Sequence, residues 1–277
     1  MSQADEISPA ALAILAIELI SGAWLCWKFS PGRAARPARL REWALPPVDF
    51  ACFIAFAFVG ATTVSSAAGY LLRPVHLDPD LALVAGGGIM HIGVLAGLAA
   101  FFLLYGARAR LTDPVASPPP VLVSGFVTFL AALPLVYATD LGWGFLLRKA
   151  GFPDEQQEMV GILENSHSAA LKLTLLAVAT VIVPFSEEIL FRAGLFRYFR
   201  TRAPRWLSIV LTSALFGALH VSWGDHMAGL PSLLPLFVLA IVFCLAYERT
   251  GRIGTTIVAH ALFNLNTFVL VLAGIGS

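Results

Sequence analysis

The sequence predicts an all-α protein, a polytopic membrane helix bundle of about eight transmembrane helices. Of its 277 residues, 58% are hydrophobic and 13% are charged, whereas a soluble domain carries about 25% charged residues. The hydrophobic residues also gather in separate runs, most of them near the ~20 residues that a helix needs to cross a bilayer. A single integral membrane domain is therefore expected, with the lipid bilayer as its first partner.

The expected spans follow from the limits of these runs. In order, they cover residues 9–29, 48–72, 81–105, 120–147, 169–191, 206–223, 232–247 and 253–273. The sixth and seventh spans are short, and Pro134 favours a kink in the fourth. Between the fourth and fifth spans, residues 153–165 begin with a proline and acids and continue with an apolar stripe. That pattern predicts an amphipathic helix at the outer interface of the membrane.

The Lys and Arg residues are divided unevenly between the two sides of the bundle. Of the 18, 14 lie at or after the ends of spans one, three, five and seven, and the other side holds Arg73, Arg148, Lys149 and Lys172. Positive residues stay mostly on the cytoplasmic side. Both termini are therefore expected outside the cytoplasm (N-out and C-out), with the bacterial inner membrane as the expected location. The net charge of +1 implies no nucleic-acid partner.

The fifth span ends in two adjacent glutamates, Glu187 and Glu188. Charged side chains at membrane depth are costly, so a pair of them calls for a reason. Glu188 and Arg192 are four residues apart and share one helix face, which predicts an ion pair. Glu187 then remains free to act as a base. The alternative for this stretch is a helix end whose charges reach out to water.

Two later spans add two histidines and an amide. His220 ends the string Phe216-x-x-x-His220, and His260 and Asn264 are four residues apart on one face of the last span. A single buried His or Asn is more often a hydrogen-bonded core residue. Three spans that each bring such a group instead favour a hydrolytic site with a base, two proton carriers and an amide donor.

Other chemistries lack their sequence signatures. The chain has no His-Glu-x-x-His zinc motif and no Gly-x-Ser-x-Gly elbow. Its cysteines, Cys26, Cys52 and Cys244, lie in separate apolar runs without a Cys-x-x-Cys spacing. We therefore interpret the cysteines as packing residues and expect neither disulfides nor metal ligands among them.

Three motifs in the last spans resemble, in order, those of the CPBP family, which comprises the CAAX prenyl protease type II and bacteriocin-processing (Abi) proteins. They are Glu187-Glu188-x-x-x-Arg192, Phe216-x-x-x-His220 and His260-x-x-x-Asn264. The chain departs from the family's usual first motif at Ala193, where a glycine is common. The resemblance covers residues 169–277, which become the expected catalytic helices. Residues 1–168 hold spans one to four and the outer amphipathic segment, and spans one to three carry no recognised motif.

The resemblance implies an intramembrane endopeptidase that hydrolyses a peptide bond of a membrane-anchored peptide or protein substrate. Prenylated CAAX termini, leader peptides and C-terminal sorting signals are all compatible with the family. Matched to the positions of the family's motifs, the resemblance implies that Glu187 activates water and that His220 helps to hold and deprotonate this water. His260 and Asn264 stabilise the oxyanion, while the Glu-Arg pair of the first motif positions the site.

Two alternatives remain open. No cofactor is expected, but Glu187, His220 and His260 are also a ligand set that suits catalytic zinc, with water as the fourth ligand. A non-catalytic membrane scaffold or immunity protein that keeps the fold is the second alternative. The presence of acid, histidines and amide together argues against a scaffold, which needs none of them.

The depths in the membrane that the sequence predicts for Glu187 and His220 differ. At about 1.5 Å per helical residue, Glu187 lies ~15 Å from Arg197, whereas His220 lies ~22 Å from Arg205. A shared site therefore requires the sixth span to protrude, tilt or break on its cytoplasmic side.

Overall fold

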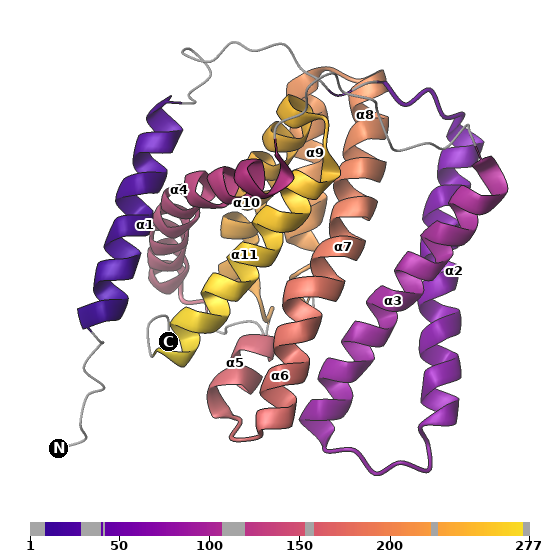
Figure 1. The fold of residues 1–277 in the computed structure, drawn as a ribbon, viewed down its shortest axis with the longest axis horizontal. Coiled ribbons are helices and arrows are strands. Elements are labelled where there is room, and N and C mark those ends of the chain that lie inside the picture. The colour runs from indigo at the N-terminus through magenta and orange to yellow at the C-terminus, as the bar shows by residue number, and fades with distance from the viewer. Residues whose placement is uncertain are drawn as a thin grey trace.

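The computed structural model describes residues 9–28, 40, 42–106, 120–152, 158–222 and 227–273. Within these ranges the regular structure is helical, without strands, so the predicted helical membrane bundle is confirmed (Figure 1). The α-helices are α1 (Pro9–Lys28), α2 (Pro47–Leu71), α3 (Pro79–Tyr105), α4 (Val121–Ala150), α5 (Glu158–Asn165), α6 (Ala169–Ala177), α7 (Val183–Glu188), α8 (Arg197–Arg202), α9 (Arg205–Ala218), α10 (Leu230–Thr250) and α11 (Ile253–Leu272). Two π-helical segments, η2 (Val178–Ile182) and η3 (Ile189–Phe196), join α6, α7 and α8 into one continuous helix.

Six helical stretches in the described residues are long and apolar enough to cross a bilayer: α2, α3, α4, the stack from α6 to α8, α10 and α11. Of the other two expected spans, the first corresponds to α1, which has 20 residues and a described apolar stretch at 16–25. The sixth is shorter than expected, because α9 has 14 residues. The fifth span runs on to Arg202, well beyond its expected end. The seventh, expected to be short, is a helix of 21 residues, and Pro134 lies inside the continuous helix α4.

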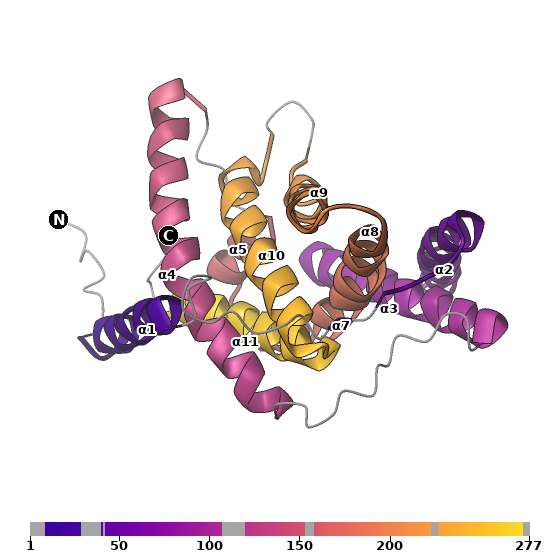
Figure 2. The ribbon, with the colours of Figure 1, turned by 90° about the horizontal axis from the view of Figure 1, so that it is seen from above.

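The helices from α6 to α11 form a central group with other helices on both sides (Figures 1 and 2). Helix α4 packs against α1, α10 and α11, whereas α2 pairs with α3, and α3 contacts α6, η2 and α7. Glycines allow the close pairing of α2 and α3, because a Cβ on Gly93 or Gly97 would meet the backbone of α2. The hairpin of α2 and α3 therefore flanks the helix that carries the two glutamates.

The turn between α8 and α9 resolves the mismatch in depth. Helix α8 ends at Arg202 and α9 begins at Arg205, so the two helical stretches form an antiparallel hairpin. Glu187 lies before this turn and His220 lies after it, at about equal distances along the chain. The two side chains therefore reach the same level without a break in α9.

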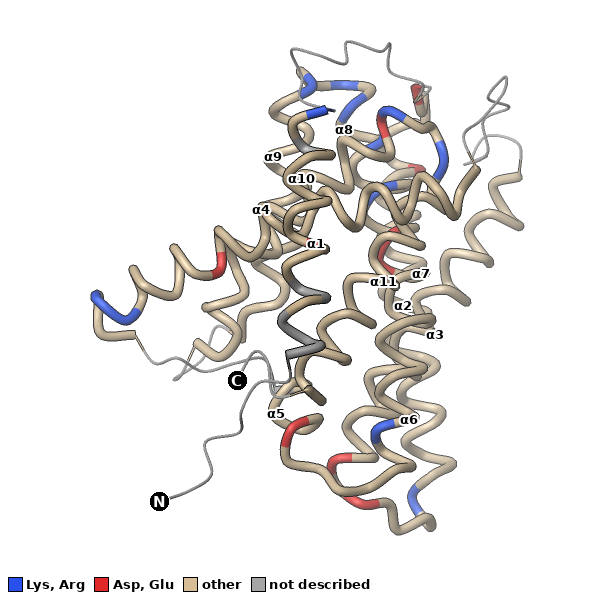
Figure 3. Tube along the Cα trace, turned by 60° about the vertical axis from the view of Figure 1, so that its left-hand side comes forward, with Lys and Arg blue, Asp and Glu red and all other residues tan. Residues whose placement is uncertain are grey.

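Basic residues gather at the end of the bundle where α8 lies (Figure 3). There Glu248 of α10 accepts hydrogen bonds from Arg200 at 2.8 Å and Arg205 at 2.5 Å. Arg202 donates to the backbone carbonyl of Leu45, just before α2. These contacts tie α8, α9, α10 and the segment before α2 together at one end.

Helix α5 closes part of the opposite end (Figure 1). Its Met159, Ile162 and Leu163 pack in one cluster with Val84 of α3 and Leu175 of α6. The amphipathic helix predicted there is thus present from Glu158 onwards, and residues 153–157 lie outside the described part. Its apolar stripe is used for packing against the bundle.

The described cysteine side chains, Cys52 and Cys244, are free thiols. Cys244 is fully buried in a core cluster with Phe196 and Tyr247, as expected for a packing residue. The side chain of Cys26 lies outside the described part.

Candidate active site

The adjacent glutamates lie at the end of α7 and have different surroundings. Glu188 is fully buried, and its Oε1 accepts a hydrogen bond from Arg192 Nη1 at 2.9 Å. The ion pair predicted from the spacing is therefore confirmed. Glu187 keeps 12% of its side chain exposed, and its Oε2 has no hydrogen-bond partner among the described residues.

Two aromatic rings cover the guanidinium of Arg192, which is itself fully buried. The guanidinium carbon lies 4.4 Å from the ring centroid of Phe216 and 5.2 Å from that of Phe243. A cation over an aromatic face is stabilised by the ring quadrupole, most strongly when water is excluded. The phenylalanine of the second motif thus belongs to the environment of the Glu188–Arg192 pair.

His260 of α11 links the two glutamates. Its Nδ1 lies 2.9 Å from Glu188 Oε1, and because a carboxylate paired with an arginine only accepts hydrogen bonds, Nδ1 is the donor. In the neutral ring, Nε2 therefore carries the lone pair. This Nε2 lies 3.9 Å from Glu187 Oε2.

His220 reaches Glu187 from the turn that follows α9. Its Nδ1 donates to the carbonyl oxygen of Phe216 at 2.7 Å, which again leaves the lone pair of the neutral ring on Nε2. This Nε2 lies 3.8 Å from Glu187 Oε1. Both imidazole contacts are longer than a direct hydrogen bond, a spacing at which a bridging water is commonly found.

Asn264 lies one helical turn beyond His260 and has a separate partner. Its Nδ2 donates to the carbonyl oxygen of Ala179 at 2.7 Å. In the π-helical register of η2, the N–H of Val183 bonds to the carbonyl of Val178, five residues earlier. In the same register the carbonyl of Ala179 would accept from Pro184, but proline has no N–H. Asn264 therefore supplies the hydrogen bond that Pro184 cannot make.

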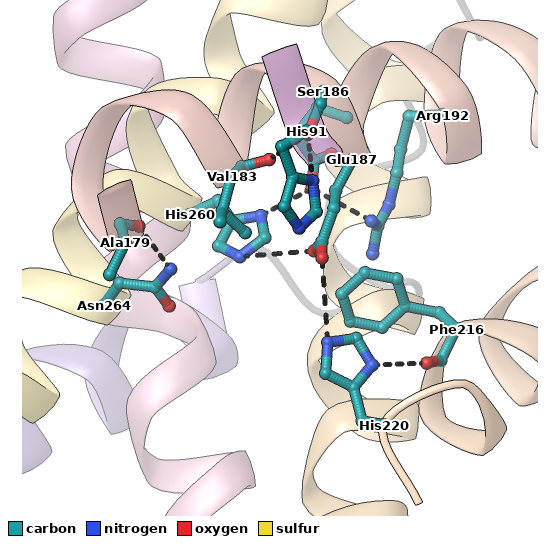
Figure 4. Close-up of polar contacts among 11 residues, drawn as sticks. His91, Ala179, Val183, Ser186, Glu187, Arg192, Phe216, His220, His260 and Asn264 are labelled. Atoms are coloured by element: carbon teal, nitrogen blue, oxygen red, sulfur yellow. Dashed lines mark hydrogen bonds and ion pairs between the residues drawn. The ribbon is translucent and has the colours of Figure 1, made fainter. Parts of the chain in front are cut away.

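The structure brings five of the six residues predicted for the site into one network (Figure 4). They are Glu187, Glu188, Arg192, His220 and His260. Asn264 lies beside this network and contacts the backbone of the helix stack that carries Glu187, whereas the resemblance implied a donor to the oxyanion.

The sequence interpretation missed His91 of α3. Its Nδ1 lies 2.6 Å from Ser186 Oγ, and its ring interacts electrostatically with Glu187, His220 and His260. Figure 4 shows the ring beside Glu187. Its signal in the sequence was a lone histidine in the middle of an apolar span, and such residues usually face the interior of a bundle.

The zinc alternative depends on how the acidic, imidazole and thiol side chains are arranged. Among the described residues, no group of three or more His, Cys, Asp or Glu side chains is placed to hold a metal ion. Glu187, His220 and His260 are neighbours, but as arranged they do not form such a group.

Comparison with known families agrees with the motifs. Residues 169–266 match the model of the family described as type II CAAX prenyl endopeptidase Rce1-like. This range contains all three motifs and excludes His91. The resemblance inferred from the sequence is therefore confirmed for this part of the chain.

Individual relatives are distant. A Bacillus subtilis (strain 168) protein named "Putative membrane peptidase YdiL" is 28% identical over 44% of this chain and 45% of its own length. An uncharacterized 24.3 kDa Escherichia coli protein is 28% identical over 61% of this chain and 74% of its own. An uncharacterized protein of Mycoplasma capricolum is 31% identical over 37% and 29%, respectively. No solved structure matches the chain significantly.

Proposed function

We propose that this protein is an intramembrane endopeptidase in which Glu187 activates water to hydrolyse a peptide bond. The observation that carries the proposal is the pair of imidazole Nε2 atoms, 3.8 and 3.9 Å from the two oxygens of Glu187. The neighbouring Glu188 is already paired with Arg192. The carboxylate of Glu187 thus remains available to a substrate in this proposal. The match of residues 169–266 to a prenyl endopeptidase family supports the same assignment.

The reaction can be assigned to these residues step by step. Glu187 removes a proton from water as the water oxygen attacks the carbonyl carbon of the scissile bond. The Nε2 lone pair of His220 accepts a hydrogen bond from the other hydrogen of the water. When the C–N bond breaks, the proton held by Glu187 passes to the leaving nitrogen. The products are an amine and a carboxylic acid, so atoms and charge balance.

His260 is the residue that faces the developing oxyanion in this proposal. Because Glu188 holds the proton of Nδ1, Nε2 can donate to an oxyanion only in the doubly protonated ring. Removing one donor to an oxyanion typically costs about 2.7–4 kcal/mol of transition-state stabilisation. Asn264 then supports the site through the backbone of Ala179, which fixes the helix stack that carries Glu187.

The substrate class follows from the family and from the depth of the site. We infer a peptide or protein held at the membrane, with a prenylated CAAX terminus as the first candidate. Leader peptides and C-terminal sorting signals are the other candidates, and a panel of peptides from each class separates them.

The test is cleavage of a fluorescence-quenched, prenylated CAAX peptide by the purified protein in detergent. Glu187→Gln keeps the shape of the side chain and removes the base, so cleavage should fall about 10²–10⁴-fold, with an unchanged melting temperature. Glu164→Gln, an exposed change on α5, is the matched control and should cleave normally. Cleavage by Glu187→Gln at the wild-type rate would exclude the mechanism. A folded wild-type protein that cleaves no peptide of the three classes would favour the scaffold.

Metal dependence is tested in the same assay. Protein purified without added metal should cleave, and strong chelators should leave the rate unchanged. Inactivation by a chelator, reversed by zinc alone, together with stoichiometric zinc in active preparations, would instead assign Glu187, His220 and His260 as ligands.

We further propose the N-out and C-out orientation in a bacterial inner membrane, which puts the basic end of the bundle around α8 in the cytoplasm (Figure 3). Reporter fusions at Ser277 should read outside, and fusions after Arg41 should read inside. The opposite pattern would reverse the side from which substrates enter.

A further inference from the structure

We propose that His91 of α3 is a third imidazole of the active site and that its Nε2 accepts a hydrogen bond from the N–H of the scissile peptide bond. This proposal rests on the proposed function and extends the site beyond the matched residues 169–266. It also assigns a role in the chemistry to the hairpin of α2 and α3.

The hydrogen-bond pattern determines which nitrogen of His91 is protonated. Ser186 Oγ donates its hydrogen to the carbonyl oxygen of Val183 at 3.0 Å. A hydroxyl has a single hydrogen, and we assign it to the bond with the Val183 carbonyl, so that Ser186 Oγ accepts in its contact with His91 Nδ1 at 2.6 Å. His91 Nδ1 is therefore the donor, and in the neutral ring the lone pair is on Nε2.

The same pattern is found in all three histidines around Glu187. The Nδ1 of His220 is held by the carbonyl of Phe216, and the Nδ1 of His260 by Glu188. Each ring is thus oriented by an acceptor on its Nδ1 side, and each presents Nε2 as an acceptor when neutral. His91 shares this arrangement, although it comes from a helix on the flank of the central group.

The position of His91 directs its Nε2 towards the reaction. Ser186 directly precedes Glu187 on α7, and it holds the opposite nitrogen of the ring. Figure 4 shows the ring of His91 beside the carboxylate of Glu187. Glu187 and the two other histidines act on it electrostatically, as expected for groups that border one space. The serine that holds this ring is itself buried, since Ser186 is 1% exposed.

Counting hydrogens assigns the partner of His91. The attacking water has two hydrogens, and the proposed mechanism uses one for Glu187 and one for His220. His260 in its protonated form faces the oxyanion as a donor. The remaining acceptor is His91 Nε2, and the remaining donor at the reacting bond is the substrate N–H. A hydrogen bond between them would orient the leaving nitrogen so that its developing lone pair faces the proton on Glu187.

Two substitutions separate the two nitrogens of the ring. His91→Asn places an amide near the position of Nδ1, so it keeps a donor for Ser186 and loses the acceptor at Nε2. His91→Gln places its amide near the position of Nε2 and loses the contact with Ser186. If Nε2 acts on the substrate, His91→Asn should lower kcat/KM roughly tenfold, as for one lost hydrogen bond, while keeping the wild-type melting temperature. His91→Gln should retain more activity.

The substrate supplies the decisive comparison. A depsipeptide with an ester in place of the scissile amide has no N–H at that position. Wild type and His91→Asn should therefore cleave the ester at equal rates and differ only on the amide. His76→Asn, an exposed change in the connection between α2 and α3, is the control and should match wild type on both substrates.

Each contrary result has a distinct meaning. Equal loss on ester and amide would overturn the assignment of the N–H, because His91 would then act on water or on the fold. Wild-type rates of His91→Asn on both substrates would remove His91 from the site. In both cases Glu187→Gln, measured alongside, remains inactive if the proposed function holds, so failure of the inference is distinguishable from failure of the proposed function.

Discussion

The two faces of α7 carry the same side chain in adjacent positions and use it differently. On one face, Glu188 is fully buried and bonded to both Arg192 and His260 at 2.9 Å. On the other face, Glu187 is 12% exposed, and the nearest described basic nitrogens lie at 3.8 and 3.9 Å. The first carboxylate therefore makes direct bonds to a cation and an imidazole, whereas the second has neighbouring imidazoles only beyond hydrogen-bond distance.

This difference indicates how a helical membrane protein accommodates two adjacent carboxylates. A buried charge is tolerated when it is paired and hydrogen-bonded. The charges of Glu188 and Arg192 are paired, although Glu188 Oε2 and Arg192 Nε and Nη2 have no hydrogen-bond partner among the described residues. Through His260, Glu188 also orients a ring that faces Glu187. Substitutions on the Glu188 face should mainly change stability, and substitutions on the Glu187 face should mainly change activity.

The largest expected effect on stability is that of Arg192→Ala. The substitution leaves Glu188 buried without its cation, which typically costs about 3–5 kcal/mol. The variant should accumulate poorly in membranes or melt far below wild type in detergent. The measurement is thermal unfolding, with Glu187→Gln as the matched variant on the other face.

A double variant sharpens this prediction. Glu188→Gln combined with Arg192→Met removes both charges and keeps the volumes similar, so it should be more stable than Arg192→Ala alone. An Arg192→Ala protein that melts like wild type but no longer cleaves would contradict the division between the two faces, because Arg192 would then belong to the chemistry.

A smaller effect is expected at Asn264. Asn264→Ala leaves the half-buried carbonyl of Ala179 without this donor, and the loss should cost about 1–3 kcal/mol at most, the range for a fully buried group. Pro184→Ala adds the missing N–H, so the double variant should recover part of the lost stability. No recovery in thermal unfolding would disprove the link between Pro184 and Asn264. Asn266→Ala, which loses a bond to Tyr137, should show no such rescue.

The smallest effect is expected for Phe216→Leu. The substitution removes the ring 4.4 Å from the guanidinium carbon of Arg192, an interaction of about 0.5–2 kcal/mol. A modest drop in melting temperature is expected, and the drop should disappear when Arg192 and Glu188 are already replaced by Met and Gln. An equal drop in both backgrounds would mean that Phe216 acts through packing alone.

Local spacing was enough to predict the contacts made within one helix. Glu188 and Arg192 are four residues apart, and helical geometry brings such side chains together in any fold. The long apolar runs likewise predicted the six helical stretches of the described residues that are long and apolar enough to cross a bilayer, because the bilayer sets their length. The depth of His220 was misjudged because the fifth span was ended at residue 191, whereas the helix continues to Arg202.

The sequence by itself determined the helical membrane fold, the three motifs and the Glu188–Arg192 pair, since these follow from composition and from short helical spacings. Only the tertiary structure decided that His91 bonds to Ser186, next to Glu187, and that Asn264 bonds to Ala179. These contacts join residues that are 95 and 85 positions apart, and no local periodicity encodes them. They depend on which helices pack together, and that is set by the fit of whole helix surfaces.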